Sequence, residues 1–317
     1  MTEYAKGIRE QIGWFEEVSF NDQTGLTMTA DGEIVGYDCI FTPSFSQNIQ
    51  EIANNGSDDA ELKSFEKGPL RYNFTLEFVP YNWKFLKYCT HGDVTNTDNT
   101  YFTHTFTKTN DAKTFTIERA IRQETNEVYQ LHGCTIKNLK IDYGKGSGSK
   151  DTFLKVTAEC IGIGKEDVSI ATISAATLDP FQNWMATFTY KGSTITPINN
   201  FSLVLDNGIN ESDSENASAD LNRELNEPIP TTKRYNFSGN INQSDKSFAE
   251  DFTGEYVSGT HTLVFSRGTN DKITFSFTDL MISNAFGGTN FDGINTRDVA
   301  ALVRSLGIVA EDADDTY

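Results

Sequence analysis

The stretches RYNFTLEF (71–78) and RYNFSGNI (234–241) begin with the same four residues and lie about half a chain length apart in a sequence of 317 residues. In the first stretch every second residue is apolar, namely Tyr72, Phe74, Leu76 and Phe78. A period of two indicates a strand that is buried on one face. The second stretch keeps the same phase relative to the shared word, so both predict a strand in the same register.

The surroundings of the shared word also occur twice, in the same order. A polar, acidic segment precedes each copy (54–69 and 206–230). Two further landmark pairs are TPSFS (42–46) with TPINNFS (196–202), and TNEVYQLHGCTIKN (125–138) with TNDKITFSFTDLMISN (269–284). This order predicts a tandem duplication of one small fold, with domains 1–175 and 176–317.

Helical patterns are few and short. One follows Asn82 through Trp83, Leu86 and Cys89 and ends at His91-Gly92; the other follows Asp245 through Phe248 and Phe252 and ends at Gly254. The one longer candidate is TRDVAALVRSL (296–306), where an apolar stripe precedes Gly307. The second domain is therefore expected to carry the long acidic loop 206–230, a C-terminal helix and a solvated tail, EDADDTY.

The composition is that of a β protein. Phe, Tyr, Thr and Val stand between turn-forming residues, with 23 Phe, 12 Tyr and only seven Pro. Phase slips in the alternation between 129 and 143 predict β-bulges where a sheet bends. We therefore expect a mainly β fold of two tandem β-sandwich or half-barrel domains, each with a short helix.

The charge excludes several classes of partner. The formal net charge is −19, and both halves are acidic. Tight nucleic-acid binding and attachment to an anionic membrane both need clustered Lys and Arg, so both are disfavoured. No apolar run approaches the roughly 18 residues of a membrane span, and the N-terminal residues lack a signal-peptide pattern.

Sites of chemistry are not predicted. Cys39, Cys89, Cys134 and Cys160 have no CxxC spacing and are expected to be buried thiols of a protein made in a reducing cytosol. The four histidines lack metal-ligand spacing. GKGSGSK (144–150) has the wrong spacing for a phosphate loop and is expected to be a hairpin tip. FDGIN (291–295) lacks alternating acidic ligands. We predict no catalytic site, cofactor or metal.

The order of sequence motifs along the chain resembles that of a known protein family. The order is RYNFTLEF, WKFLKYC and IKNLKIDYGKGSGSKDTFLKVTAEC, followed by FSLVLDNGIN, a long loop, KRYNFSGNINQSDKSFAEDF and LVFSRGTNDKITFSFTDLMI. It resembles the tail tube (major tail) proteins of long-tailed viruses of bacteria and archaea, in their tandem-duplicated form. The resemblance covers most of residues 35–285. The second helical segment is shorter and more polar than the first, and the segment after 285 has no counterpart in the first half.

The resemblance implies a structural virion protein, made and assembled in the host cytoplasm. Such subunits form stacked rings whose strands join into an inner β-barrel, the conduit for the viral genome. With two copies of the fold per chain, a trimeric ring with pseudo-sixfold symmetry is preferred, and a hexameric ring is the alternative. The implied partners are further copies of the chain, the tape measure, tail terminator and baseplate or tip proteins, and DNA in transit. The acidic charge either eases DNA passage or serves solubility alone.

The two acidic loops and the hairpin tip are the expected contacts between subunits or rings. The candidate residues are Asp58, Asp59, Glu61, Lys145, Lys150, Glu211, Asp213, Glu215 and Arg223.

Two other classes of function stay open. One is another virion protein, such as a head-decoration or tail-completion protein. The other is a cell-surface β-sandwich binding module, in which Trp14, Trp83 and Trp184 would form an exposed platform. Core packing is the expected role of each tryptophan.

Overall fold

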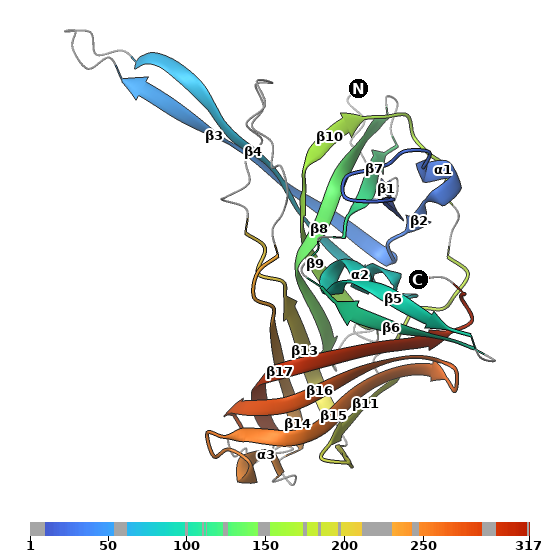
Figure 1. Cartoon of the computed structure of the whole chain (residues 1–317), viewed down its shortest axis with the longest axis vertical. Helices are drawn as coiled ribbons and strands as arrows, with labels where there is room; N and C mark the ends of the chain where they lie inside the picture. The colour runs from blue at the N-terminus through green and yellow to red at the C-terminus, as the bar shows by residue number, and fades with distance from the viewer. Residues whose placement is uncertain are drawn as a thin grey trace, which may run out of the picture.

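A computed structural model describes residues 10–53, 62–98, 101–109, 111, 113–122, 126–144, 153–173, 176–182, 185–195, 198–210, 230–242, 247–286, 296–315 and 317. Within these ranges the chain is mainly β, as the composition predicts, and its helices are single turns. Figure 1 shows two lobes stacked along the long axis, with the first half of the chain above the second.

The strands of the first half are β1 (Glu10–Glu16), β2 (Glu33–Ile34), β3 (Tyr37–Ala53), β4 (Leu62–Val79), β5 (His91–Thr97), β6 (Phe102–Lys108), β7 (Phe115–Ile121), β8 (Glu127–Gly144), β9 (Lys155–Gly162) and β10 (Gly164–Asp167). Those of the second half are β11 (Ala186–Tyr190), β12 (Ser193–Ile195), β13 (Ile198–Asp206), β14 (Arg234–Asn242), β15 (Tyr256–Gly268), β16 (Asp271–Asn284) and β17 (Thr296–Asp312). The helical turns are α1 (Met28–Asp31), η2 (Lys84–Leu86), α2 (Lys87–Thr90) and α3 (Ser247–Glu250).

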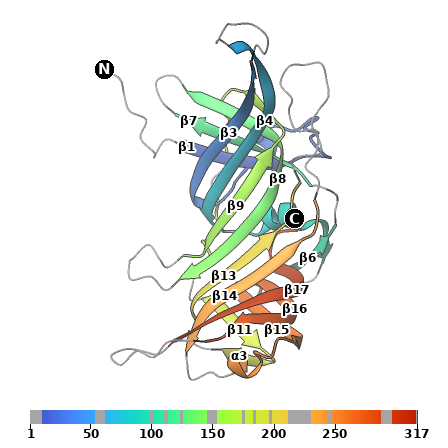
Figure 2. The same ribbon diagram turned by 90° about the vertical axis from the view of Figure 1, so that its left-hand side faces the viewer.

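One antiparallel sheet runs through both halves. Its strands pair in the order β3–β4–β9–β8–β13–β14–β17–β16. Figure 2 shows most of these strands lying side by side and slanted in the same direction. The pairing of β8 with β13 joins the two halves, so that neither half ends in a free edge at this point.

The two halves share one order of strand pairing. In the first half the order is β3–β4–β9–β8–β7–β1–β2. In the second half it is β13–β14–β17–β16–β15–β11–β12. Strands β5, β6 and β10 belong to the first half alone, and β6 pairs with the far end of β17.

Aromatic side chains fill the space between the layers, and the shared word supplies them in both halves. The rings of Phe41 and Phe74 lie 5.0 Å apart, and those of Phe201 and Phe237 lie 5.1 Å apart. Trp83 is buried between the halves, where its ring contacts those of Phe181, Phe265 and Phe275. Trp14 is buried too, so these two tryptophans form no exposed platform. Trp184 lies outside the described residues.

The short helices lie where the sequence predicts them, with altered ends. The first begins after Trp83, which takes the N-cap position that the sequence assigned to Asn82. It ends at His91, whose backbone is left-handed with φ of 59°. The second, α3, contains the buried Phe248, and Asp245 lies outside the described residues.

The predicted C-terminal helix is wrong, because residues 296–306 belong to the strand β17. The buried positions are Val299, Ala301, Val303, Leu306, Ile308 and Ala310. Their spacing is two, except for one step of three between Val303 and Leu306. That single slip places apolar residues at helical intervals in the sequence, although the period on each side is that of a strand.

The predicted acidic loop 54–69 is also too long, since β4 begins at Leu62. Here β3 and β4 continue as a two-stranded ribbon, with Glu51 opposite Phe65. The ribbon projects away from the body of the molecule (Figure 1). The sequence of residues 62–69 lacks the alternation by which strands are recognised.

The predicted β-bulges are confirmed. Strand β8 changes register against β7 and again against β9, near Gly133 and Lys137. The buried Glu17 holds the first irregularity, because its carboxylate accepts hydrogen bonds from Thr116 Oγ1 and from the Gly133 backbone N–H, both at 2.8 Å. Gly133 has φ of 60°, a backbone conformation that favours glycine.

All four cysteines are free thiols. Cys89, Cys134 and Cys160 are buried, and Cys39 is partly exposed. Burial raises the pKa of the Cys89 thiol to about 12, so this side chain behaves as a small hydrophobe.

Replacing Phe237 with Ala should lower the free energy of unfolding by about 3–5 kcal/mol, because it leaves a cavity in a closely packed aromatic cluster. The matched control is Asn236→Ala, on the exposed face of the same strand, which should change it by less than about 0.5 kcal/mol. Urea denaturation measures both. Equal effects of the two substitutions would contradict the assignment of the two faces.

Candidate functional site

The face of the central sheet that points away from the core is polar. Along β4 the residues that alternate with the inward-facing ones are Asn73, Thr75 and Glu77, and along β14 they are Asn236, Ser238 and Asn240. The strand registers line up the outward-facing residues in rows across neighbouring strands, and most of these residues are polar. In one row Thr157, Lys140, Val204 and Asn236 lie opposite one another in turn.

Charges on this polar face nearly balance. On the strands from β4 to the first part of β17, the described residues supply five carboxylates and four cations: Glu77, Asp142, Glu159, Asp206 and Asp298, with Arg71, Lys140, Lys155 and Arg234. Lys155 forms an ion pair with Glu77, and Lys140 Nζ lies 2.8 Å from Asp142 Oδ2. Most of the chain's net charge of −19 therefore lies elsewhere.

The two ends of the central sheet expose apolar side chains. At one end is β3, where Ile40, Phe45 and Ile49 are exposed. At the other end Phe252 and Phe286, also exposed, contact each other with ring centroids 5.1 Å apart. Tyr256 and Leu302 lie on neighbouring strands and are exposed as well. Seven of the ten large hydrophobic side chains that are exposed among the described residues are thus at these two ends, as expected of contact surfaces.

The junction of the two halves shows how such ends can be joined. From Asn138 to Gly144, β8 pairs with β13 in continuous register. Leu139 lies opposite Leu205, and both are buried. Asn207, just beyond β13, donates from its backbone N–H to the Lys137 carbonyl (2.9 Å) and from Nδ2 to the Ile136 carbonyl (2.8 Å). The junction therefore combines a backbone ladder, an apolar core row and an amide clamp.

A scan of protein families matches residues 72–301, well over half of the chain, to the family described as phage tail tube protein. The chain belongs to the phage tail tube protein family. It is thus a structural component of the virion tail. A search among curated proteins gives no match.

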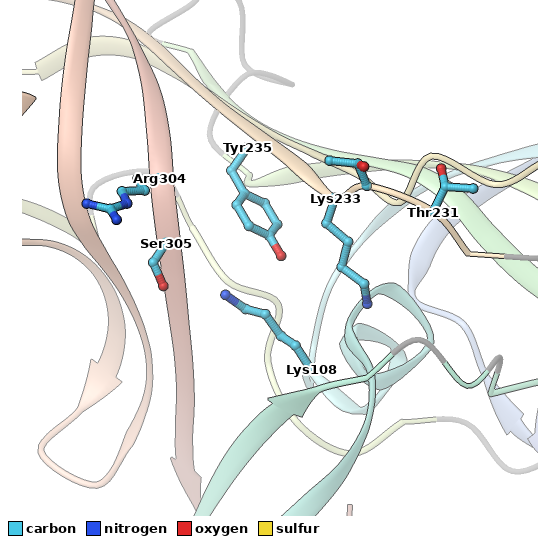
Figure 3. A pocket seen from close by; sticks show the side chains of 7 residues that line it. Lys108, Thr231, Lys233, Tyr235, Arg304 and Ser305 are labelled. Atoms are coloured by element: carbon cyan, nitrogen blue, oxygen red, sulfur yellow. The ribbon is translucent and has the colours of Figure 1, made fainter.

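A second feature of this tail tube protein is a shallow basic basin between β6, β14 and β17. Lys108, Thr231, Thr232, Lys233, Tyr235, Arg304 and Ser305 line it. Figure 3 shows Lys108 and Tyr235 pointing toward one another, while Arg304 points away. The Lys108 ammonium lies 4.8 Å from the centre of the Tyr235 ring. Arg304 instead contacts Asp279 at 3.2 Å.

The two lysines of the basin are half-buried without a carboxylate partner in the part of the chain that the structure describes. Lys233 Nζ donates to the Thr90 carbonyl at 2.5 Å. Burial, and then the charge of Lys233, lowers the pKa of Lys108 to about 8. Burial also lowers the pKa of Lys233. The pKa of the His91 imidazole is lowered to about 3, first by burial and then by the charge of Lys233. The positive charges of Lys108 and Lys233 therefore reduce the stability of the folded chain.

Because the pKa of Lys108 is lower in the fold than its ordinary value of 10.5, its charged form costs stability below about pH 8, and the cost disappears as the pH rises toward 10.5. Lys108→Met should therefore raise the free energy of unfolding at pH 7 by about 1 kcal/mol, a value reduced for solvent screening. The difference in free energy of unfolding between Lys108→Met and the parent should vanish near pH 10. Urea denaturation at both pH values measures this. A variant less stable than the parent at pH 7 would contradict it, and Lys113→Met, at a partly exposed lysine that pairs with Asp93, is the control.

None of the nine interface candidates from the sequence lies within the described residues. Asp58, Asp59 and Glu61 fall in 54–61, Lys145 and Lys150 in 145–152, and Glu211, Asp213, Glu215 and Arg223 in 211–229. The structure points instead to the apolar ends of the central sheet and to its polar face as candidate sites. One signal for the face was present in the sequence, since the alternation that predicts the buried residues also specifies their polar neighbours.

His104 has a structural role. His104 is buried, with Nδ1 2.7 Å from Asn96 Oδ1 and Nε2 3.1 Å from Asp312 Oδ1. The ring of Tyr317 stacks on it at 3.8 Å. Among the described residues no three His, Cys, Asp or Glu side chains converge as a metal site would require. No helix in the same ranges is long and apolar enough to span a membrane.

Proposed function

We propose that this protein assembles with itself into stacked rings that form the tail tube, and that the viral genome passes through the bore. The carrying observation is a central sheet that runs through both halves and ends, on each side, in an exposed apolar edge. Open edges invite pairing with another chain, and closure into a barrel removes them. In the proposed ring the polar face of the sheet lines the bore.

We further propose that the chain arose by tandem duplication, with one domain in 1–175 and the other in 176–317. The common order of seven paired strands supports this, together with the shared word at Tyr72 and Tyr235. The contact of the first half with the second, through β8 and β13, would then repeat between copies. An end-to-end contact of this kind generates a ring when its rotation closes. Two units per chain favour three chains per ring, and a ring of six chains is the alternative.

The chemistry of the polar face suits the passage of DNA. Clustered cations would neutralise phosphates and retain the duplex. On the described face the cations are outnumbered by carboxylates, and two of them, Lys140 and Lys155, are held in ion pairs. Amides and hydroxyls occupy most remaining positions. On this view the bore is nearly neutral, and the large net charge of the chain serves mainly solubility or contacts outside the bore.

The acidic loops remain proposed contacts between subunits or rings, through the carboxylates of 54–61 and 211–229 and the lysines of 145–152. Tape measure, terminator and baseplate or tip proteins are the further partners proposed, with assembly in the host cytoplasm. The family match favours the tail over a head-decoration protein, and the buried Trp14 and Trp83 disfavour a carbohydrate platform.

Negative-stain electron microscopy of the purified, concentrated protein tests the proposal. We expect hollow rings or tubes of uniform bore, because the apolar ends of the sheet are left for another copy. Native mass spectrometry of the rings should give three times the mass of one chain. Six chains per ring would replace the trimer, and dispersed monomers at every concentration and salt condition would refute self-assembly.

Deleting residues 209–225 should leave a folded chain that does not form long tubes, since the acidic loop is proposed to contact the next ring. Thermal unfolding checks folding, and tube length in electron micrographs checks assembly. The control replaces Glu211, Asp213 and Glu215 with their amides, which keeps the loop length and removes the charge. Tubes of normal length from the deletion would exclude the loop from ring stacking.

A further inference from the structure

We infer that the ring closes through one strand register, in which β3 of one copy lies antiparallel to the end of β16 in the next. In this register Ser46 of one copy lies opposite Asn284 of the other, and Phe45 lies opposite Ala285. The inference rests on the proposed ring assembly and adds the residues at which copies join.

The first support is a change of partner that occurs along β8. This strand pairs with β7 as far as Cys134 and with β13 from Asn138 onward. Between these segments it carries a one-residue bulge against β9, after Ile136. The bulge bends the strand out of one layer and into the other, where a new neighbour can pair with its edge.

Strand β16 carries the same bulge at the equivalent place. It pairs with β15 as far as Met281, and its register against β17 shifts between Ile282 and Asn284. The strand registers show that the two bulges are equivalent. In the first half Ile136 lies opposite Cys160, which lies opposite Phe74 of the shared word. In the second half Ile282 lies opposite Ala301, which lies opposite Phe237, the same position of that word. Asn284 thus corresponds to Asn138. Asn138 pairs with β13. Asn284 pairs with β17, but among the described residues no second strand pairs with it on the side where β13 pairs with Asn138.

Strand β3 of another copy can supply the missing neighbour of β16, because β3 is the first-half equivalent of β13. Phe45 lies opposite Tyr72, as Leu205 lies opposite Tyr235, so β3 stands in the first half where β13 stands in the second. Among the described residues β3 pairs with β4 only. One end of the molecule therefore lacks a β13, and the other end supplies an unpaired equivalent of it.

The core row of the inferred contact is apolar, as it is in the internal junction. In the internal junction Leu139 faces Leu205, and both are buried. Between copies the same row would hold Phe45 with Ala285, a large residue with a small one, so the row stays apolar. Phe45 is 38% exposed in a single copy, and pairing would bury it.

Two neighbouring features fit the same contact. Gln47 follows Ser46 as Asn207 follows Asp206, so its amide can repeat the clamp on the bulge, donating to carbonyls at Ile282 and Ser283. The end of α3 would take the place that α2 occupies at the internal junction, where the Thr90 carbonyl accepts from Lys233. The exposed Phe252–Phe286 pair beside α3 would then lie against the next copy.

Disulfide cross-linking tests the register on assembled rings of the full chain. Ser46→Cys with Asn284→Cys, oxidised mildly and run on a non-reducing denaturing gel, should give covalent dimers and closed trimers. The shifted pair Ser44→Cys with Asn284→Cys should cross-link at least about tenfold more slowly, because diagonal neighbours lie about 7–8 Å apart, too far for a strain-free disulfide.

Matched controls make each outcome decisive. Asn138→Cys with Asp206→Cys is the same pair within one copy and should form an intrachain disulfide without a change in mass. Asn284→Cys alone controls for the native cysteines. Rings that appear in the electron microscope but cross-link no faster at Ser46 than at Ser44 would overturn the register and leave the proposed function standing. The absence of rings from every variant and from the parent would overturn both.

Discussion

The structure depends on the hydrogen bonds that β8 makes on its two edges. A backbone edge that is left unpaired attracts other chains, so each strand edge has to be paired, covered or reserved for a partner. By leaving β7 and joining β13, one strand of 18 residues belongs to an outer layer at its start and to the central sheet at its end. The bulges near Gly133 and Lys137 make that change possible, and both lobes are positioned by it.

Much of the fold could be predicted because alternation reports burial on one face. The words at Tyr72 and Tyr235 gave the correct phase of two core strands, and both side chains are buried. The slips in β8 were recognisable as bulges for the same reason. The strand β17 was mistaken for a helix because its slip falls between Val303 and Leu306, where it imitates the spacing of a helical stripe.

The candidate site was harder to predict, because it depends on which strands become neighbours. The polar face of each strand follows from alternation, but the rows of Lys140, Val204 and Asn236 exist only through pairings distant in sequence. The apolar ends are also invisible in the sequence, since Phe45 looks like any core residue until β3 proves to lack a second neighbour among the described strands. The basin of Lys108 and Lys233 combines residues more than a hundred positions apart.

The course of β17 has a consequence for the order of events in synthesis. This strand pairs with β14 and β16 in its own lobe and with β6 of the first lobe, with Ile308 opposite Phe106. The first lobe therefore cannot complete its pairing until about residue 312 has left the ribosome, and contacts of such long range fold slowly. A chain that ends before β17 leaves β6 without this partner and leaves β14 and β16 without the strand that lies between them.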